Sequence, residues 1–283
     1  MCRHFGYVGD PVGLTELVFT PPHSLATQAY APQEMRGGGT VNVDGFGVGW
    51  FPADGEAPRS APTAESPETG GHPTARRYRR AVPIWQDANF AELAATTKVS
   101  CALGALRNAT VGMPVAEAAC APFTDGRWLF SLNGRIAGWP DTAVRLAAEL
   151  PMRQLLTLEA PTDSALLWAV LRHRLAVAES QGVLDPAAVL AGLVAQLLVD
   201  APGSRLNTLL TDGRCLYATA ASHSLWSWHS TSGVLLASEP FDGDPAWNPI
   251  KDASVVTADR GGVSTIPLRL LSPEESEVDA YQG

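Results

Sequence analysis

The chain has 283 residues, of which 46% are hydrophobic, and a formal net charge of -9. This is enough apolar material for one large core or two small ones, since domains commonly hold ~100 to 200 residues. The negative net charge does not favour binding to nucleic acid or anionic lipid. No stretch reaches the ~20 apolar residues of a membrane span, and the N-terminus lacks the hydrophobic run of a secretory signal. We therefore expect a globular cytoplasmic protein that acts on a small molecule.

Four cysteines occur, at Cys2, Cys101, Cys120 and Cys215. In the cytoplasm these thiols would stay reduced, so we interpret three of them as small buried hydrophobic residues. Their spacing contains no C-x-x-C, and no histidine pair lies nearby to complete a zinc site. We therefore expect neither a metal nor another cofactor. The oligomeric state stays open, with a homo-oligomer among the alternatives.

The first half of the chain is rich in predicted strands. Alternation of apolar and small residues predicts strands at 3–8, 44–51, 99–106 and 127–132. The segment 44–51 (DGFGVGWF) reads as a glycine-rich strand or a bulged edge, and 22–31 holds a short helix. Residues 52–80 are dense in Pro, Gly, Ser and charge, which predicts a long mobile loop inside one domain.

Helices dominate the middle of the chain, and strands return after it. Helices are predicted at 141–150, from Thr162 or Asp163 through 174 or beyond, and at 186–198, where Asp185 is the N-cap and Pro186 occupies N1. Strands follow at 206–210, 214–219, 225–228, 234–238, 254–258 and 263–268. This order predicts one α+β domain over 2–272, with two sheets stacked between helical layers and a flexible acidic tail over 273–283.

Cys2 is the first candidate for chemistry, because removal of Met1 would give it a free amine beside its thiol. A thiol of reference pKa ~8.5 next to an α-amine of reference pKa ~8 forms a self-contained nucleophile and base. The alternative is an ordinary cysteine that happens to lie near the start of the chain. Position alone does not decide between them.

Three further segments carry polar groups where a predicted strand ends or a helix begins. Arg107 in ALRNATVG could pair with a carboxylate, and Asn133-Gly134 in FSLNGRIAG offers an amide and a backbone N–H for an oxyanion. Asp163 in APTDSALLW could receive an ammonium group. Each has a second interpretation: a surface charge for Arg107, a hairpin turn for Asn133-Gly134 and a helix cap for Asp163.

Taken together and in this order, these segments resemble the class II glutamine amidotransferases, which are N-terminal-nucleophile hydrolases. The matching pieces are MCRHFGYVG, DGFGVGWF, LRNATVG, LFSLNGRIAG, PTDSALLW and VLLASEPFD, which span residues 2 to about 242. The resemblance implies a four-layer αββα sandwich with Cys2 as the nucleophile and its own amine as the base. It further implies an oxyanion hole at Asn133 and Gly134, a glutamyl α-carboxylate held by Arg107 with Thr110, and an α-amine held by Asp163.

Two departures from the family pattern argue against a standard glutamine-fed synthase. Leu132 stands where many members have histidine, and Asn108 follows the arginine where an aromatic residue is common. We also expect no synthetase domain within these residues, because the C-terminal third, rich in predicted strands, is needed to complete the sandwich.

Within the family, the nearest likeness is to the branch that cleaves the glutamyl group from γ-glutamyl-hercynylcysteine sulfoxide in ergothioneine biosynthesis. The 52–80 loop and the aromatic residues Trp50, Tyr78 and Trp85 would then line the side where the leaving group exits. The alternatives are a glutaminase subunit of a two-chain amidotransferase, a glutathione-degrading γ-glutamyl hydrolase, and an inactive glutamyl-binding module.

Overall fold

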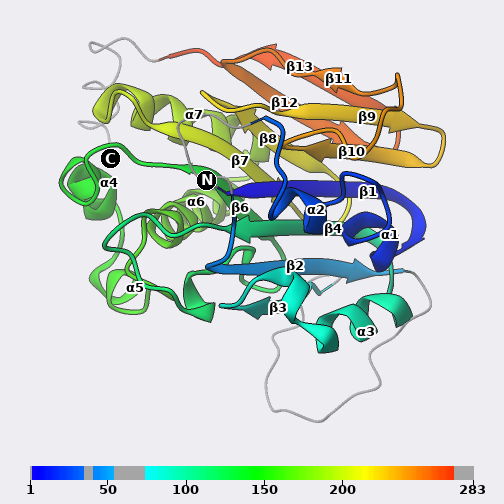
Figure 1. Ribbon diagram of the computed structural model, residues 1–283. Helices are drawn as coiled ribbons and strands as arrows, with labels where there is room; N and C mark the ends of the chain where they lie inside the picture. The colour runs from blue at the N-terminus through cyan, green and yellow to red at the C-terminus, as the bar shows by residue number, and fades with distance from the viewer. Residues whose placement is uncertain (1, 35–40, 54–73, 271–283) are drawn as a thin grey trace.

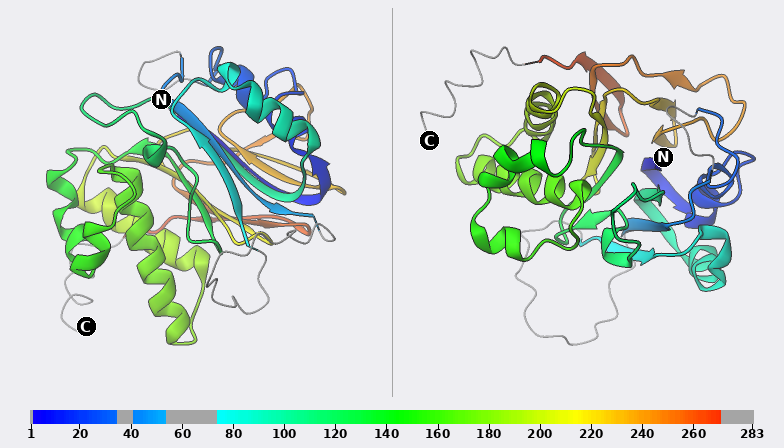
Figure 2. Two further views of the ribbon diagram at one scale, coloured as in Figure 1. Left: turned by 90° about the horizontal axis from the view of Figure 1, so that it is seen from below. Right: turned by 60° about the vertical axis from the view of Figure 1, so that its left-hand side comes forward.

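The computed structural model describes residues 2–34, 41–53 and 74–270 of the chain. In this part of the chain, two antiparallel sheets lie face to face, and helices cover the outer face of each sheet (Figure 1). The left view of Figure 2 shows the green and yellow helices on one outer side and the blue and cyan helices on the other. The predicted α+β arrangement of two sheets between helical layers is therefore confirmed.

One sheet has seven strands in the order β11-β9-β10-β1-β4-β2-β3. Its strands are β1 (Arg3–Gly13), β2 (Gly45–Pro52), β3 (Arg76–Arg80), β4 (Lys98–Arg107), β9 (Trp226–Ser230), β10 (Gly233–Ala237) and β11 (Asn248–Pro249). The central strand β1 pairs with β4 on one side and with β10, from late in the chain, on the other. A strand from the start of the chain and a strand from late in the chain therefore pair in the middle of this sheet.

The other sheet has six strands in the order β13-β12-β8-β7-β6-β5. Its strands are β5 (Phe123–Thr124), β6 (Leu129–Arg135), β7 (Arg205–Thr211), β8 (Leu216–Ala220), β12 (Ser254–Asp259) and β13 (Gly262–Pro267). β6 pairs with β7 along its whole length, and β1 packs across the face of both. The start of the seven-stranded sheet is thus brought against the middle of the six-stranded one.

The six-stranded sheet is covered by α4 (Val144–Ala148), α5 (Met152–Leu156), α6 (Asp163–Ser180) and α7 (Pro186–Asp200). The seven-stranded sheet is covered by α1 (Leu14–Val18), α2 (Leu25–Gln28) and α3 (Ala88–Thr96). Short 3-10 turns occupy Ile84–Gln86, Glu117–Ala119 and Asp141–Ala143. Asp185 caps α7 as predicted, accepting from the N–H of Ala188 at 3.1 Å. None of the helices in the described part of the chain combines the length and apolar character that crossing a bilayer requires.

Side-chain alternation along the strands divides the apolar residues into three cores. Phe5 and Tyr7 of β1 pack outward against α1, α2 and α3, whereas Val8 packs inward between the sheets. In β6, Phe130 packs outward against α6 and α7, and Leu129 packs inward. Because successive side chains of a strand point to opposite faces, the same alternation decides which polar residues face the space between the sheets.

The glycines of β2 explain the DGFGVGWF motif. Gly47 and Gly49 face the space between the sheets, and a Cβ on Gly47 would lie 2.3 Å from the carbonyl oxygen of Ala121. A Cβ on Gly49 would lie 2.5 Å from the side chain of Leu129. β2 is an internal strand that pairs with both β3 and β4. Of the two predicted alternatives, the strand is therefore right and the edge position is wrong, although the pairing with β4 shifts register between Phe51 and Pro52, as at a bulge.

The predicted mobile loop over 52–80 is wrong in its last part, because Arg76–Arg80 forms β3 and pairs with β2. The charged sequence RRYRR forms an edge strand in which Arg77 and Arg79 both bind Glu159, at 3.3 and 2.9 Å. Residues 54–73 of that loop and the predicted tail over 273–283 lie outside the described residues. The helix predicted at 141–150 is interrupted, with a 3-10 turn preceding α4.

Candidate active site

The candidate residues gather at one end of the central strands of the seven-stranded sheet, where β1 and β2 begin and β4 and β10 end. Arg3 of β1 stands opposite Leu106 of β4. Cys2, which directly precedes β1, therefore lies beside Arg107, the last residue of β4. Gly45 of β2 stands opposite Arg107 on its other side. The fold thus brings together the predicted nucleophile and the predicted carboxylate-binding arginine.

Cys2 is on the face of β1 that looks toward the six-stranded sheet. Phe5 points to the outer core, so alternation turns His4 inward, and Cys2 with it. The inward direction of His4 is confirmed by its contact with β6, where Nδ1 lies 2.8 Å from Oγ of Ser131. Cys2 is a free thiol and is only partly buried. A nucleophile at this place is both held by the sheet and open to a substrate.

Asn133 and Gly134 lie inside β6, opposite Asn207 and Leu206 of β7. The hairpin-turn interpretation of this pair is therefore wrong. Gly134 has φ +156°, and a Cβ there would lie 1.8 Å from the carbonyl oxygen of Arg205, so only glycine fits. Asn133 is 1% exposed, and its Nδ2 donates to Oγ of Ser238 at 3.1 Å. Its Oδ1 is buried and has no hydrogen-bond partner among the described residues.

Arg107 is a buried cation, which excludes the surface-charge interpretation. The residue is 8% exposed, and no atom of the described residues accepts a hydrogen bond from its Nη1. Leaving a buried charged donor unpaired is unfavourable. An arginine held in this way beside the thiol of Cys2 is suited to an anionic group on a ligand.

Asp163 is the first residue of α6 and is 4% exposed. Thr162 caps the helix by accepting from the N–H of Ala165 at 3.2 Å, so the cap interpretation of Asp163 is wrong. The carboxylate accepts from the N–H of Ile136 at 3.0 Å and from the N–H of Ser164 at 2.7 Å. Burial raises the pKa of Asp163, while these hydrogen bonds and the charge of Arg107 oppose the rise.

Thr110 and Asp163 line one pocket, which has a volume of about 340 Å³. Apolar and aromatic side chains form much of its wall, together with one cation, Arg135. The lining includes Met113, Arg135, Ile136 and Trp139. Cys2, Asn133 and Arg107 do not line it, although the charge of Arg107 acts on Asp163. Of the predicted glutamyl-binding residues, Thr110 and Asp163 therefore line this pocket, whereas Arg107 lies outside its lining, at the end of β4.

Comparison with known proteins fits this geometry. No family model matches the chain. A γ-glutamyl-hercynylcysteine sulfoxide hydrolase from Mycolicibacterium smegmatis is 36% identical over 268 residues, which cover 95% of this chain and 100% of that protein. A hydrolase of the same name from Mycobacterium tuberculosis is 35% identical over 95% of this chain and 97% of its own. The chain belongs to the family of γ-glutamyl-hercynylcysteine sulfoxide hydrolases.

Solved structures show that the fold of this hydrolase family member is that of the class II glutamine amidotransferases. A class II glutamine aminotransferase domain protein from Silicibacter pomeroyi superposes with a TM-score of 0.61. It is 21% identical, and the match covers 95% of this chain and 100% of that one. The predicted N-terminal-nucleophile hydrolase sandwich is therefore confirmed.

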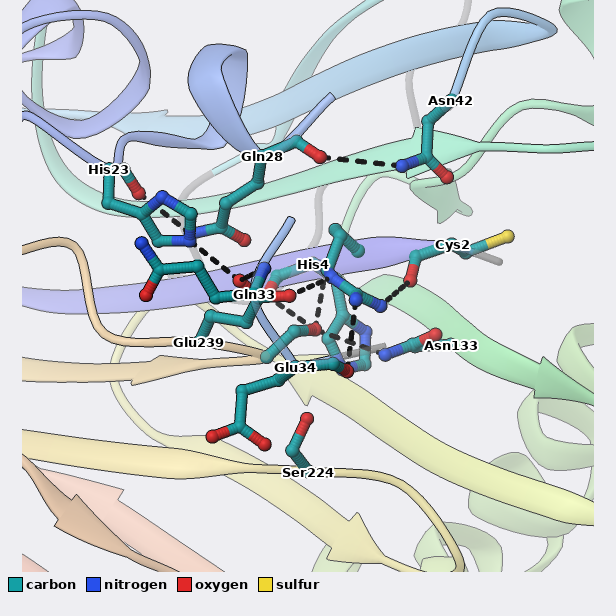
Figure 3. A network of polar contacts seen from close by, with 12 residues as sticks. Cys2, His4, His23, Gln28, Gln33, Glu34, Asn42, Asn133, Ser224 and Glu239 are labelled. Atoms are coloured by element: carbon teal, nitrogen blue, oxygen red, sulfur yellow. Dashed lines mark hydrogen bonds and ion pairs between the residues drawn. The ribbon is translucent and has the colours of Figure 1, made fainter. Parts of the chain in front are cut away.

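On the opposite face of β1 from Cys2, an ion pair between Arg3 and Glu239 anchors the first residues of the hydrolase. Figure 3 shows Glu239 beside His23 and Gln33. Arg3 is 1% exposed, and its Nε donates to Oε1 of Glu239 at 2.6 Å. Its Nη1 donates to the carbonyl oxygen of Cys2 at 3.0 Å, and its Nη2 donates to that of Glu34 at 3.1 Å. One guanidinium thus fixes the backbone of the candidate nucleophile.

Glu239 completes this arrangement, which we call the outer network and which also includes Arg3, His23 and the main chain of Cys2, Gln33 and Glu34. The carboxylate is fully buried, and its Oε2 lies 2.6 Å from Nε2 of His23 and accepts from the N–H of Gln33 at 2.7 Å. Burial alone would raise the pKa of Glu239, but the hydrogen bond to His23 and the charge of Arg3 lower it. The carboxylate therefore stays charged and holds the segment before residue 35 against β1.

Two of the aromatic residues expected on the exit side have structural roles instead. Trp50 is buried in the outer core. Tyr78 stacks on Phe90 with ring centroids 5.1 Å apart and donates to Asp87 at 2.9 Å. Trp85 is 44% exposed, so it alone keeps a surface position.

The structure also shows residues at the site that the sequence reasoning missed. Arg3 lies in the segment MCRHFGYVG, and Ser238 and Glu239 lie in VLLASEPFD, but local patterns assigned no role to these three residues. The signal was the presence of charge and hydroxyl in two segments that otherwise read as buried strands. Among the described residues, no group of three or more His, Cys, Asp or Glu side chains is placed to hold a metal ion.

Proposed function

We propose that the protein hydrolyses the γ-glutamyl amide of γ-glutamyl-hercynylcysteine sulfoxide, releasing glutamate and hercynylcysteine sulfoxide in ergothioneine biosynthesis. The observation that carries this proposal is the place of Cys2. It lies at the start of β1, beside the buried Nη1 of Arg107 and on the sheet face opposite Asn133. The proposal also rests on the names of relatives that match nearly the whole chain.

Cys2 acts as the nucleophile once Met1 has been removed. The neutral α-amine takes the thiol proton, and Sγ attacks the γ-carbonyl carbon. The C–N bond then breaks as the ammonium returns a proton to the leaving nitrogen, which produces a γ-glutamyl thioester. Water attacks this thioester and gives up a proton to the amine, the C–S bond breaks, and the sulfur regains a proton as glutamate leaves.

Asn133 and Gly134 stabilise the negative oxygen that develops in both steps. Asn133 supplies a side-chain N–H and Gly134 a backbone N–H, from a strand held rigidly by β7. Donors that are already oriented need no reorganisation when the charge appears. The close approach of the Arg205 carbonyl to Gly134 supports this role, since it fixes the backbone at that point.

Arg107, Thr110 and Asp163 bind the α-carboxylate and the α-ammonium group of the glutamyl substrate. The unpaired Nη1 of Arg107 would receive the α-carboxylate. Asp163 accepts three hydrogen bonds, from Ile136 N and from the N and Oγ of Ser164. A carboxylate offers roughly four lone-pair sites, so Asp163 retains one for an α-ammonium group.

A substrate comparison tests the function directly. Purified protein is given γ-glutamyl-hercynylcysteine sulfoxide, glutathione or glutamine, and glutamate release is measured. We expect the sulfoxide to have by far the highest kcat/KM and Cys2→Ala to abolish turnover while leaving the fold intact. Preference for glutamine would indicate a glutaminase subunit, preference for glutathione a degradative hydrolase, and wild-type inactivity on all three a binding module.

The cytoplasm is the proposed site of action. All four cysteines lie among the described residues and all are free thiols. Unpaired thiols of this number suit a reducing compartment. A thiol-trapping measurement on cells would find Cys2 and the other three cysteines reduced.

A further inference from the structure

Ser238 stands between the strand that carries Cys2 and the side chain of Asn133. It directly follows β10, is fully buried, and faces the space between the sheets because Leu236, two residues earlier, belongs to the inner core. We propose that Ser238 is a positioning residue that holds the amide of Asn133 in the orientation needed for the oxyanion. This inference rests on the proposed function, because it assumes that Asn133 acts there.

The hydroxyl of Ser238 has a fixed position because β1 holds it from two directions. The N–H of Ser238 donates to the carbonyl oxygen of His4 at 3.0 Å. In return, the N–H of His4 donates to Oγ of Ser238 at 3.0 Å. The hydroxyl of Ser238 also donates to the carbonyl oxygen of His4, at 3.2 Å. These three bonds tie residue 238 to the strand that follows the proposed nucleophile. Whatever Ser238 holds is therefore placed in register with Cys2.

The hydrogen-bond partner of Ser238 across the gap between the two sheets is Asn133 of β6. Nδ2 of Asn133 donates one N–H to Oγ of Ser238 at 3.1 Å, and an amide nitrogen carries a second N–H. The one proton of the Ser238 hydroxyl is donated to the carbonyl oxygen of His4 at 3.2 Å, so Oγ faces Asn133 as an acceptor and selects the N–H edge of the amide. In this orientation Ser238 binds one N–H of the amide and leaves the other N–H for the oxyanion.

Among the described residues, the buried Oδ1 of Asn133 has no hydrogen bond that could orient the amide in place of Ser238. Ser238 therefore supplies the side-chain contact that fixes the amide plane. The neighbouring hydroxyl, Ser131 Oγ, is engaged with Nδ1 of His4. Without Ser238, the amide of Asn133 would sample other χ2 angles, and an oxyanion donor that is misoriented contributes less to catalysis.

The test is a double-mutant cycle on glutamate release from the γ-glutamyl substrate that the wild type turns over best. Ser238→Ala should lower kcat by roughly 10-fold or more while KM changes little, because removal of the donor itself typically costs ~100-fold to 1000-fold. In an Asn133→Ala background, Ser238→Ala should have no further effect, since its target is gone. Ser238→Thr and Ser238→Val form a matched pair of equal size, and only Thr should retain activity.

Three results would overturn the proposal. They are an unchanged kcat in Ser238→Ala, an equal loss with and without Asn133, and equal activity of the Thr and Val variants. Thermal unfolding of each variant shows whether a lost rate reflects a lost fold, and the Thr and Val comparison remains if the Ala variant does not fold. Failure of the proposed function looks different: the wild type turns over no γ-glutamyl compound, or Asn133→Ala is fully active.

Discussion

Glu239→Gln should destabilise the protein strongly, because it removes one charge of a buried ion pair. Arg3 is 1% exposed and Glu239 is fully buried, and their atoms are 2.6 Å apart. Removing one partner of such a pair leaves an uncompensated charge and typically costs ~3 to 5 kcal/mol of unfolding free energy. Glutamine keeps the size and one carbonyl oxygen, so we expect a loss near ~3 kcal/mol.

Urea unfolding measures this loss, with Glu159→Gln as the matched control. Glu159 also binds two arginines, Arg77 and Arg79, but it is 30% exposed and its pairs are screened by water. Exposed pairs contribute ~0 to 1 kcal/mol, so the control should stay close to wild type. With m near ~3 kcal/mol/M, Glu239→Gln should shift the midpoint by about 1 M at constant m.

The pH dependence of the same measurement gives the sign of the effect. Because the pKa of Glu239 is lowered in the folded state, its contribution is complete above the unfolded pKa of ~4.3 and is lost as pH falls through the folded value. The difference between wild type and Glu239→Gln should therefore be constant near neutrality and shrink in acid. A loss below ~1 kcal/mol at pH 7, or an equal loss in Glu159→Gln, would refute a role for the charge of Glu239.

Three further substitutions test the site. Arg107→Lys should raise KM for every γ-glutamyl compound by roughly 10-fold to 100-fold, equivalent to ~1.5 to 3 kcal/mol for a charged contact; an unchanged KM would place the substrate carboxylate elsewhere. Gly134→Ala should lower Tm and abolish turnover, because its Cβ would lie 1.8 Å from the Arg205 carbonyl oxygen; normal turnover would show that β7 can move. Burial, together with the charges of His223 and Arg3, lowers the pKa of His4 to about 3. The free energy of unfolding of the wild type should therefore fall between pH ~6.5 and 5, by up to ~1.4 kcal/mol per pH unit, because the unfolded chain gains a proton there and the folded protein does not. His4→Gln should reduce this slope.

Local signals in the sequence predicted most of the elements that later carry the site. Alternation found β1, β4 and β6, and the Asp185-Pro186 pair marked the start of α7 correctly. These features depend on residues close together in the chain. The short helices α1 and α3 were missed, since five or nine residues give too few turns for a clear helical period.

Contacts between distant segments could not be predicted from local patterns. Arg3 and Glu239 are 236 positions apart, and nothing in either neighbourhood indicates the other. The strand β3 was also hidden, because four arginines in five residues normally indicate a solvated loop. Its arginines donate to Glu159 and to the carbonyl oxygens of 118, 120 and 122, partners that lie at least 39 positions away in the chain.

The proposed nucleophile, Cys2, lies near a chain end, where residues tend to fray, and the side-chain alternation of β1 counters this. The strand turns Cys2 toward the second sheet and therefore turns Arg3 to the opposite face, where Glu239 is buried. From there Arg3 reaches back to the carbonyl oxygen of Cys2. The residue after the proposed nucleophile thus holds its main chain directly from the outer face. Because Arg3 and Glu239 are charged, they also bind main-chain groups, which an apolar pair could not do. Arg3 donates to the carbonyl oxygens of Cys2 and Glu34, and Glu239 accepts from the N–H of Gln33.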